Sequence, residues 1–182
     1  MDTEAIRDHV LILLTLLGED PEREGLRGTP DRVARFWSEF LDYKAGTINV
    51  TFEEITDADQ IIVVRGIQGW SMCEHHLLPF EYTVGVGYLP AQKVIGLSKI
   101  ARIVAMYAHR LQLQERLTRQ IADELELTLA PLGLGVVVKA SHLCAQMRGV
   151  HQPCIEMVTS VVRGVFREKP EARAELFALL NG

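Results

Sequence analysis

The sequence has few cysteines and no long hydrophobic run. Three cysteines among 182 residues are an odd, small number, which argues against a disulfide scaffold and favours a reducing compartment. The longest apolar stretch, residues 10–17, is far shorter than the ~20 residues that span a bilayer. The acidic start, residues 1–4, lacks the positive charge of a signal peptide. We therefore expect a cytoplasmic protein with no membrane partner.

An excess of positive charge is also absent. The chain carries 19 Lys and Arg against 24 Asp and Glu, a net charge of −5, which argues against a nucleic-acid partner. A local basic pocket can still hold an anionic ligand in such a protein. The 48% hydrophobic and 24% charged residues are typical of a globular domain, and no internal repeat or low-complexity segment interrupts it.

Hydrophobic periodicity predicts an N-terminal helical arm, residues 1–45, and then a mixed domain, residues 46–182. In the arm, residues 2–17 and 30–43 have helical spacing, with Thr29 as the cap of the second helix. In the domain we expect strands at 60–65, 82–89, 136–144 and 157–166, and helices at 98–109, 114–130 and 170–180. The order β-β-α-α-β-β predicts an α+β fold, an antiparallel sheet with helices on one face.

One cluster of metal-capable side chains precedes the second predicted strand. Cys73, His75 and His76 lie within four positions of one another. A Cys-x-x-His pair in a tight turn can bind one ion, but a buried cysteine is also a common small hydrophobe. Cys73 would share a strand face with His75 or approach His76 in a helical turn, so the spacing does not choose between the two histidines.

A second cluster ends the third predicted strand. His142 and Cys144 lie two apart and would share one face of that strand with the apolar residues before them. Together the clusters supply Cys73, one of the two histidines and either Cys144 or His142. Three ligands with an open position are a pattern typical of catalytic zinc. The alternative is a core cysteine beside a surface histidine. Cys154 lies in a predicted turn, and we expect no function for it.

Charged and polar residues near these clusters suggest an anionic, base-containing ligand. Gln114 and Glu115 begin a predicted helix, where a carboxylate is favoured by the helix dipole and could also accept bonds from a guanine edge. A polyphosphate pocket could be built from cations in three segments, although each alone is compatible with a solvated surface. These are Arg32 and Arg35, then Lys99 and Arg102 after Ser98, and Arg148.

Several long motifs in the same order resemble the GTP cyclohydrolase I family, over roughly residues 10–180. They are 73–80 (CEHHLLPF), 94–102 (VIGLSKIAR), 112–117 (QLQERL), 142–144 (HLC) and 147–150 (MRGV). The arm adds 18–21, 25–26 and 29–34, and the end of the chain adds 158–160 and 164–167.

The resemblance implies the tunnelling fold, in which such units assemble into a barrel. It also implies a homodecamer of two pentamers with active sites shared between subunits. The implied reaction converts GTP and water to formate and 7,8-dihydroneopterin triphosphate, the first step toward folates and pterins.

The resemblance also implies a role for each motif residue. It makes Cys73, His76 and Cys144 the zinc ligands, and His75, His142 and Ser98 the catalytic groups. It assigns substrate binding to Gln114, Glu115, Leu97, Lys99, Arg102, Arg148, Arg32 and Arg35.

Two departures and two rival functions accompany the resemblance. Arg35 stands where Lys is common, and Lys139 where many members have an acidic residue. One rival is another enzyme of this fold, a pterin synthase or a deazapurine nitrile reductase. Cys73 and Cys144 contradict the three-histidine zinc site of the synthase, and bound zinc would exclude the reductase. The other rival is a non-catalytic GTP- or pterin-binding module with a structural zinc, which would not require His75 and His142.

Overall fold

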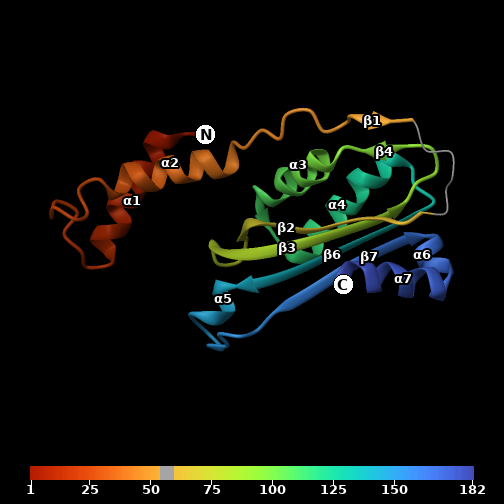
Figure 1. The fold of residues 1–182 in the computed structure, drawn as a ribbon. Coiled ribbons are helices and arrows are strands. Elements are labelled where there is room, and N and C mark those ends of the chain that lie inside the picture. The colour runs from red at the N-terminus through yellow and green to blue at the C-terminus, as the bar shows by residue number, and fades with distance from the viewer. Residues whose placement is uncertain (54–59) are drawn as a thin grey trace. The chain divides into compact units, whose positions relative to one another are not determined.

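The computed structural model describes residues 1–53 and 60–182, which form two compact units, Met1–Lys44 and Ala45–Gly182 (Figure 1). The first unit contains α1 (Thr3–Leu16) and α2 (Thr29–Leu41). The Asp2 side chain caps α1 by accepting a hydrogen bond from the Ala5 N–H at 2.9 Å. The sequence predicted Thr29 as the cap of α2, and this prediction is wrong. Gly28 is the N-cap, and the Thr29 hydroxyl instead accepts a hydrogen bond from Arg32 at 2.8 Å.

The second unit is built on a five-stranded sheet in the order β5-β2-β3-β6-β7. All neighbouring strands are antiparallel except the short β5, which is parallel to β2. The strands are β2 (Ile62–Cys73), β3 (Leu78–Leu89), β5 (Leu111–Gln112), β6 (Gly133–His142) and β7 (Met157–Gly164). A separate two-stranded ladder pairs β1 (Thr51–Phe52) with β4 (Val94–Ile95).

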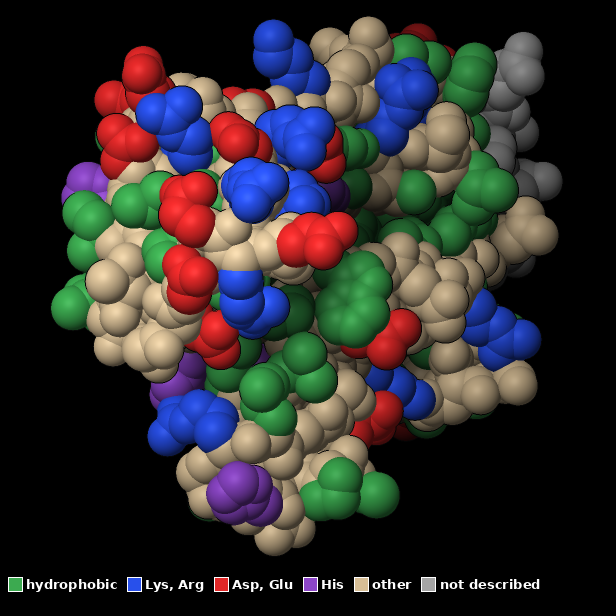
Figure 2. All heavy atoms as spheres, turned by 90° about the vertical axis from the view of Figure 1, so that its left-hand side faces the viewer, with side chains coloured by type: hydrophobic (Ala, Val, Ile, Leu, Met, Phe, Trp, Pro, Cys, Tyr) green, Lys and Arg blue, Asp and Glu red, His purple; other side chains and the backbone are tan. Residues whose placement is uncertain are grey.

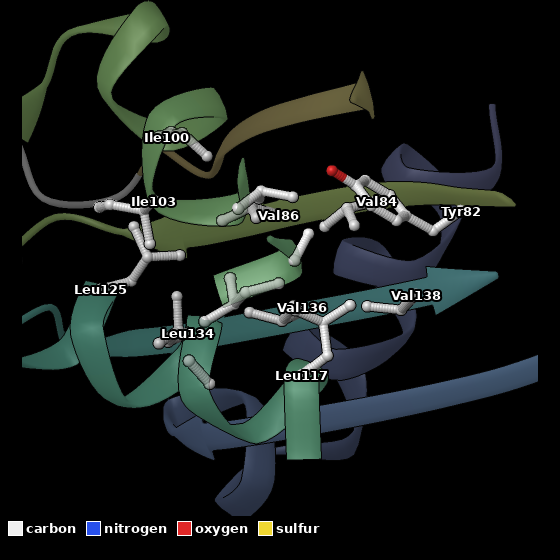
Figure 3. Packing of buried hydrophobic residues seen from close by; sticks show 14 of the residues in the cluster. Tyr82, Val84, Val86, Ile100, Ile103, Leu117, Leu125, Leu134, Val136 and Val138 are labelled. Atoms are coloured by element: carbon white, nitrogen blue, oxygen red, sulfur yellow. The ribbon is translucent and has the colours of Figure 1, made fainter. Parts of the chain in front are cut away.

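Two long helices, α3 (Leu97–Ala108) and α4 (Gln114–Leu129), cover one face of the sheet (Figure 1). Alternate residues of β3 and β6 point into the layer beneath them, as the two-residue period of a strand requires. Figure 3 shows Val84 and Val136 in this layer together with Ile103 and Leu117 from the helices, and all four are fully buried. The helix pair and the antiparallel sheet confirm the predicted α+β class.

The opposite face is partly covered by α7 (Pro170–Asn181), which follows the single-turn α6 (Val165–Glu168). Leu176 of α7 is fully buried against Gly87 and Gly135 of the sheet. A Cβ at either glycine would overlap the Leu176 side chain, so the absence of side chains lets the helix approach.

Three predicted strand boundaries are wrong in ways that matter for the site. The first strand runs on to Cys73, past a bulge between Val64 and Ile67 where Gly66 has φ +77°. The second strand begins at Leu78 instead of residue 82. The third ends at His142, and the next residues form the short helix α5 (Leu143–Gln146). Cys144 therefore does not share a strand face with His142.

Candidate active site

Three side chains from two distant segments of the sequence converge at one end of the sheet. Cys73 ends β2, His76 lies in the β2–β3 turn, and Cys144 lies in α5. Cys73 Sγ is 3.8 Å from His76 Nδ1 and 3.9 Å from Cys144 Sγ, and all three ligand atoms lie within 4.8 Å of one another. Their separations would allow all three to bind one metal ion.

The turn that carries His76 is a tight one. The Leu77 N–H donates to the Cys73 carbonyl at 2.9 Å, and Leu77 has a left-handed φ of +52°. This geometry brings His76 back toward Cys73, as the helical-turn alternative required. The ring of His75 lies edge-on to His76 with centroids 6.1 Å apart, exposed and outside the Cys-His-Cys group.

The two separations from Cys73 Sγ are compatible with ligands around one tetrahedral metal ion. For zinc, Zn–S bonds of about 2.3 Å and Zn–N bonds of about 2.0 Å at tetrahedral angles would place two sulfurs about 3.8 Å apart, and sulfur and nitrogen about 3.5 Å apart. Burial and the adjacent Cys73 raise the pKa of the Cys144 thiol. A bound cation would offset this and hold both sulfurs as thiolates.

His142 is held beside this group by two contacts. Its Nε2 lies 2.9 Å from Gln114 Oε1, and its ring stacks on Phe80 with centroids 4.4 Å apart. Phe80 is directly opposite His142 in the β3–β6 ladder, which explains the stacking. Burial lowers the pKa of His142, while the charge of Glu115 opposes this effect.

Gln114 is buried at the start of α4, with 1% of its surface exposed. Its Nε2 donates to the carbonyls of Val138 at 3.0 Å and Met157 at 2.9 Å, which assigns Oε1 as the atom that faces His142. Because an amide oxygen can only accept, this assignment makes His142 Nε2 the donor, and in the neutral ring Nδ1 is then the acceptor. The Gln114 amide is thus engaged by the protein, whereas Glu115 beside it is exposed.

A further group of predicted site residues lies at the start of α3. Ser98, Lys99 and Arg102 are in the first two turns of α3, and Lys99 Nζ donates to the Thr47 carbonyl at 3.0 Å. The last residue of α3, Ala108, accepts a hydrogen bond from Ser71, two positions before Cys73. At a rise of 1.5 Å per residue, Ser98 lies about 15 Å and Arg102 about 9 Å from Ala108 along the helix axis.

The remaining predicted binding residues are scattered. Leu97 and Arg148 are exposed, and Arg148 follows α5 closely enough that its charge partly opposes the rise in the pKa of Cys144 caused by burial. Arg32 and Arg35 belong to the first unit, where Arg35 lines a cavity together with Arg7.

Two contributions to the site were not found in the sequence. Phe80 lies in a quoted motif, but its stacking on His142 depends on strand register, for which the sequence carried no signal. Glu74 and Arg116 also lie in quoted motifs and form a two-pronged ion pair, with oxygen–nitrogen distances of 2.5 and 3.0 Å. The feature of the sequence that could have pointed to Glu74 is its position between the candidate ligands Cys73 and His76.

Acidic and basic side chains are intermingled on the face shown in Figure 2. Among residues 1–53 and 60–182, no helix is both long enough and apolar enough to cross a membrane.

The fold and the Cys-His-Cys group define a tunnelling-fold protein with a candidate metal site, and comparisons with known proteins identify the family. The family model for GTP cyclohydrolase I matches residues 6–181, and the chain belongs to this family.

Curated relatives match over the full chain. GTP cyclohydrolase 1 of Aquifex aeolicus (strain VF5) is 47% identical over 182 residues, covering 100% of this chain and 98% of the relative. The Sulfurihydrogenibium sp. (strain YO3AOP1) protein of the same name is 48% identical, covering 100% and 96%. The Dictyostelium discoideum protein of that name is 46% identical, covering 97% and 77%.

One solved structure supports the fold alone. The archaeosine synthase QueF-Like, in its apo form, aligns with a TM-score of 0.50 and 18% identity, covering 59% of this chain and 97% of that one. The predicted family and tunnelling fold are confirmed.

Proposed function

We propose that this protein is a zinc-dependent GTP cyclohydrolase, which converts GTP and water to formate and 7,8-dihydroneopterin triphosphate at the head of folate and pterin synthesis. The observation that carries the proposal is the Cys73, His76 and Cys144 group, which lies beside His142 in a chain matched end to end by the family. We further propose a cytoplasmic location.

Zinc is the metal that suits the donor set. Two thiolates and one imidazole are soft and borderline ligands, which favour zinc over magnesium or calcium. When bound, zinc would supply the Lewis acidity that makes water nucleophilic near neutral pH. Cys73, His76 and Cys144 would hold the ion, and three protein ligands leave room for a water or substrate atom.

The proton transfers would fall to the two histidines outside the ligand set. Hydrolysis at carbon 8 of the purine needs a proton delivered to nitrogen 7, and the later rearrangement of the ribose needs further transfers. His142 is held by Gln114 and Phe80 and can relay a proton at Nδ1. His75 lies in the same turn as His76 and is exposed, so it would be accessible to an incoming substrate.

Recognition of the base would fall to Glu115. Its carboxylate accepts hydrogen bonds only, which complements the N–H donors along the guanine edge and not the adenine edge. The buried Gln114 side chain would support recognition by binding the first turn of α4, which carries Glu115, to the sheet.

The triphosphate would be held by cations from more than one subunit. Lys99 and Arg102, with the catalytic candidate Ser98, lie about 9 to 15 Å along α3 from Ala108, and we infer that a neighbouring copy supplies them to a shared site. Together with Leu97, Arg148, Arg32 and Arg35, they complete the proposed substrate set. A homodecamer of two pentamers provides such shared sites.

The deciding experiment incubates the zinc-loaded protein with GTP and measures formate together with a fluorescent oxidised pterin. Glu115→Gln should retain zinc and lose turnover. The matched control is Glu171→Gln, which changes a carboxylate in the first turn of α7 and should keep wild-type turnover. Absence of formate from the wild-type protein would refute the activity, and an active Glu115→Gln would refute its role in recognition.

A further inference from the structure

Glu74 is the first residue of the turn that carries His76, and the proposed metal-binding site gives it no role. It follows Cys73 directly and precedes His76 by two positions, so it lies between two proposed ligands. Its backbone N–H donates to the Gln112 carbonyl of β5 at 3.1 Å. Its carboxylate points toward α4 and binds both terminal nitrogens of Arg116.

The Glu74–Arg116 ion pair is bidentate, although both side chains are partly exposed. Both carboxylate oxygens are engaged, at 2.5 and 3.0 Å, and the side chains of Arg116 and Glu74 are 35% and 29% exposed. Two parallel N–H···O bonds fix direction as well as distance, unlike a single contact between point charges. The pair therefore joins the ligand turn to the first turn of α4 in one orientation.

The turn needs such an outside contact. Leu77 adopts a left-handed backbone conformation that L residues rarely take, and His76 is exposed. Within the described residues, the contacts that tie the turn to α4 and β5 are the Glu74 backbone bond to Gln112 and the Glu74–Arg116 pair. Arg116 is also the residue that follows Glu115.

We propose that Glu74 and Arg116 are positioning residues that set the spacing between the metal ligands and the base-recognition carboxylate Glu115. This inference rests on the proposed function, in which the metal acts on one ring of the purine while Glu115 holds the other. A rigid base must meet both groups at once. Loss of the pair therefore impairs the alignment of a bound base as well as retention of the metal.

The test is a double-mutant cycle on the pair, with a second ion pair as control. Glu74→Gln and Arg116→Met each remove one partner, and the double variant removes both. Arg163→Met is the control, because Arg163 of β7 joins the same helix through Asp123 and Glu126. Each protein is measured for zinc retained against a competing chelator, for kcat and KM with GTP, and for Tm.

We expect each single variant to lose roughly 10- to 100-fold in kcat/KM and to release zinc at lower chelator concentration. The double variant should be little worse than either single one, because the residues act as a unit. Arg116→Lys keeps the charge and should recover only part of the loss, since it cannot bind both oxygens. Arg163→Met should lower Tm and leave zinc retention and kcat/KM unchanged.

Three outcomes would overturn the inference. They are single variants within about two-fold of wild type, losses that add fully in the double variant, or an equal loss of zinc and kcat/KM in Arg163→Met. The zinc measurement does not use GTP. If the wild-type protein fails to convert GTP, the proposed function fails, while zinc retention still shows whether the pair holds the ligand turn.

Discussion

Replacing Gln114 with methionine should cost both stability and turnover. The side chain is buried and its amide nitrogen, with two protons, faces three acceptors, while its oxygen faces His142. Gln114→Met keeps a similar length and removes two bonds at the nitrogen and one at the oxygen. At about 1 kcal/mol for each net hydrogen bond, the variant should lose about 3 kcal/mol in free energy of unfolding.

The assay is urea unfolding of both proteins at one fixed chain concentration, because assembly also contributes to measured stability. The control is Gln120→Met, the same substitution on the same helix. The Gln120 side chain accepts one hydrogen bond, from Gln112 at 2.7 Å, so its loss should cost only about 1 kcal/mol. Turnover of Gln114→Met should also fall about ten-fold or more, since His142 is no longer held in one orientation.

Two results would refute this reasoning. If Gln114→Met is no less stable than Gln120→Met, the buried amide does not bridge β6 and β7 as the geometry states. If stability falls but turnover with GTP is unchanged, Gln114 is structural and the orientation of His142 does not depend on it.

Three further predictions concern the thiols, the adjacent histidines and alkaline pH. Cys144→Ser should lose zinc and formate release, while Cys154→Ser, at an exposed position, should keep both by elemental analysis; the reverse pattern would move the site to another thiol. His76→Ala should lose zinc, whereas His75→Ala should retain it and lose turnover, and inverted metal contents would contradict the assignment. Burial and a carboxylate hydrogen bond raise the pKa of Tyr107 from 10.0 to about 12. The protonated Tyr107 side chain therefore contributes to the free energy of unfolding fully below pH 10.0, and this contribution should be lost as the pH rises toward 12. Tyr107→Phe should remove that part of the loss in alkaline unfolding curves, and an unchanged pH dependence would refute the shift.

Much of the local structure could be predicted from the sequence. The helices at 97–108 and 114–129 agree with their apolar spacing to within one or two residues, because each buries one stripe against the sheet. The first strand was predicted too short, since Arg65, Gly66 and Gly69 interrupt its apolar pattern. The structure continues the strand through a bulge at Gly66, and Gly69 gives room to the Tyr82 ring.

The sequence by itself determined the residue types of the candidate metal site and the closeness of Cys73 and His76, because a four-residue turn limits how far the two can separate. The residue pattern left Cys144 and His142 open as the third ligand, and the family resemblance named Cys144. Only the tertiary structure places the Cys144 thiol beside Cys73, since this depends on the pairing of β3 with β6 and on the end of β6 at His142. The partners of Gln114 and of Glu74 were decided in the same way. Periodicity reports which face of an element is buried, whereas strand register and helix packing decide which distant side chains meet.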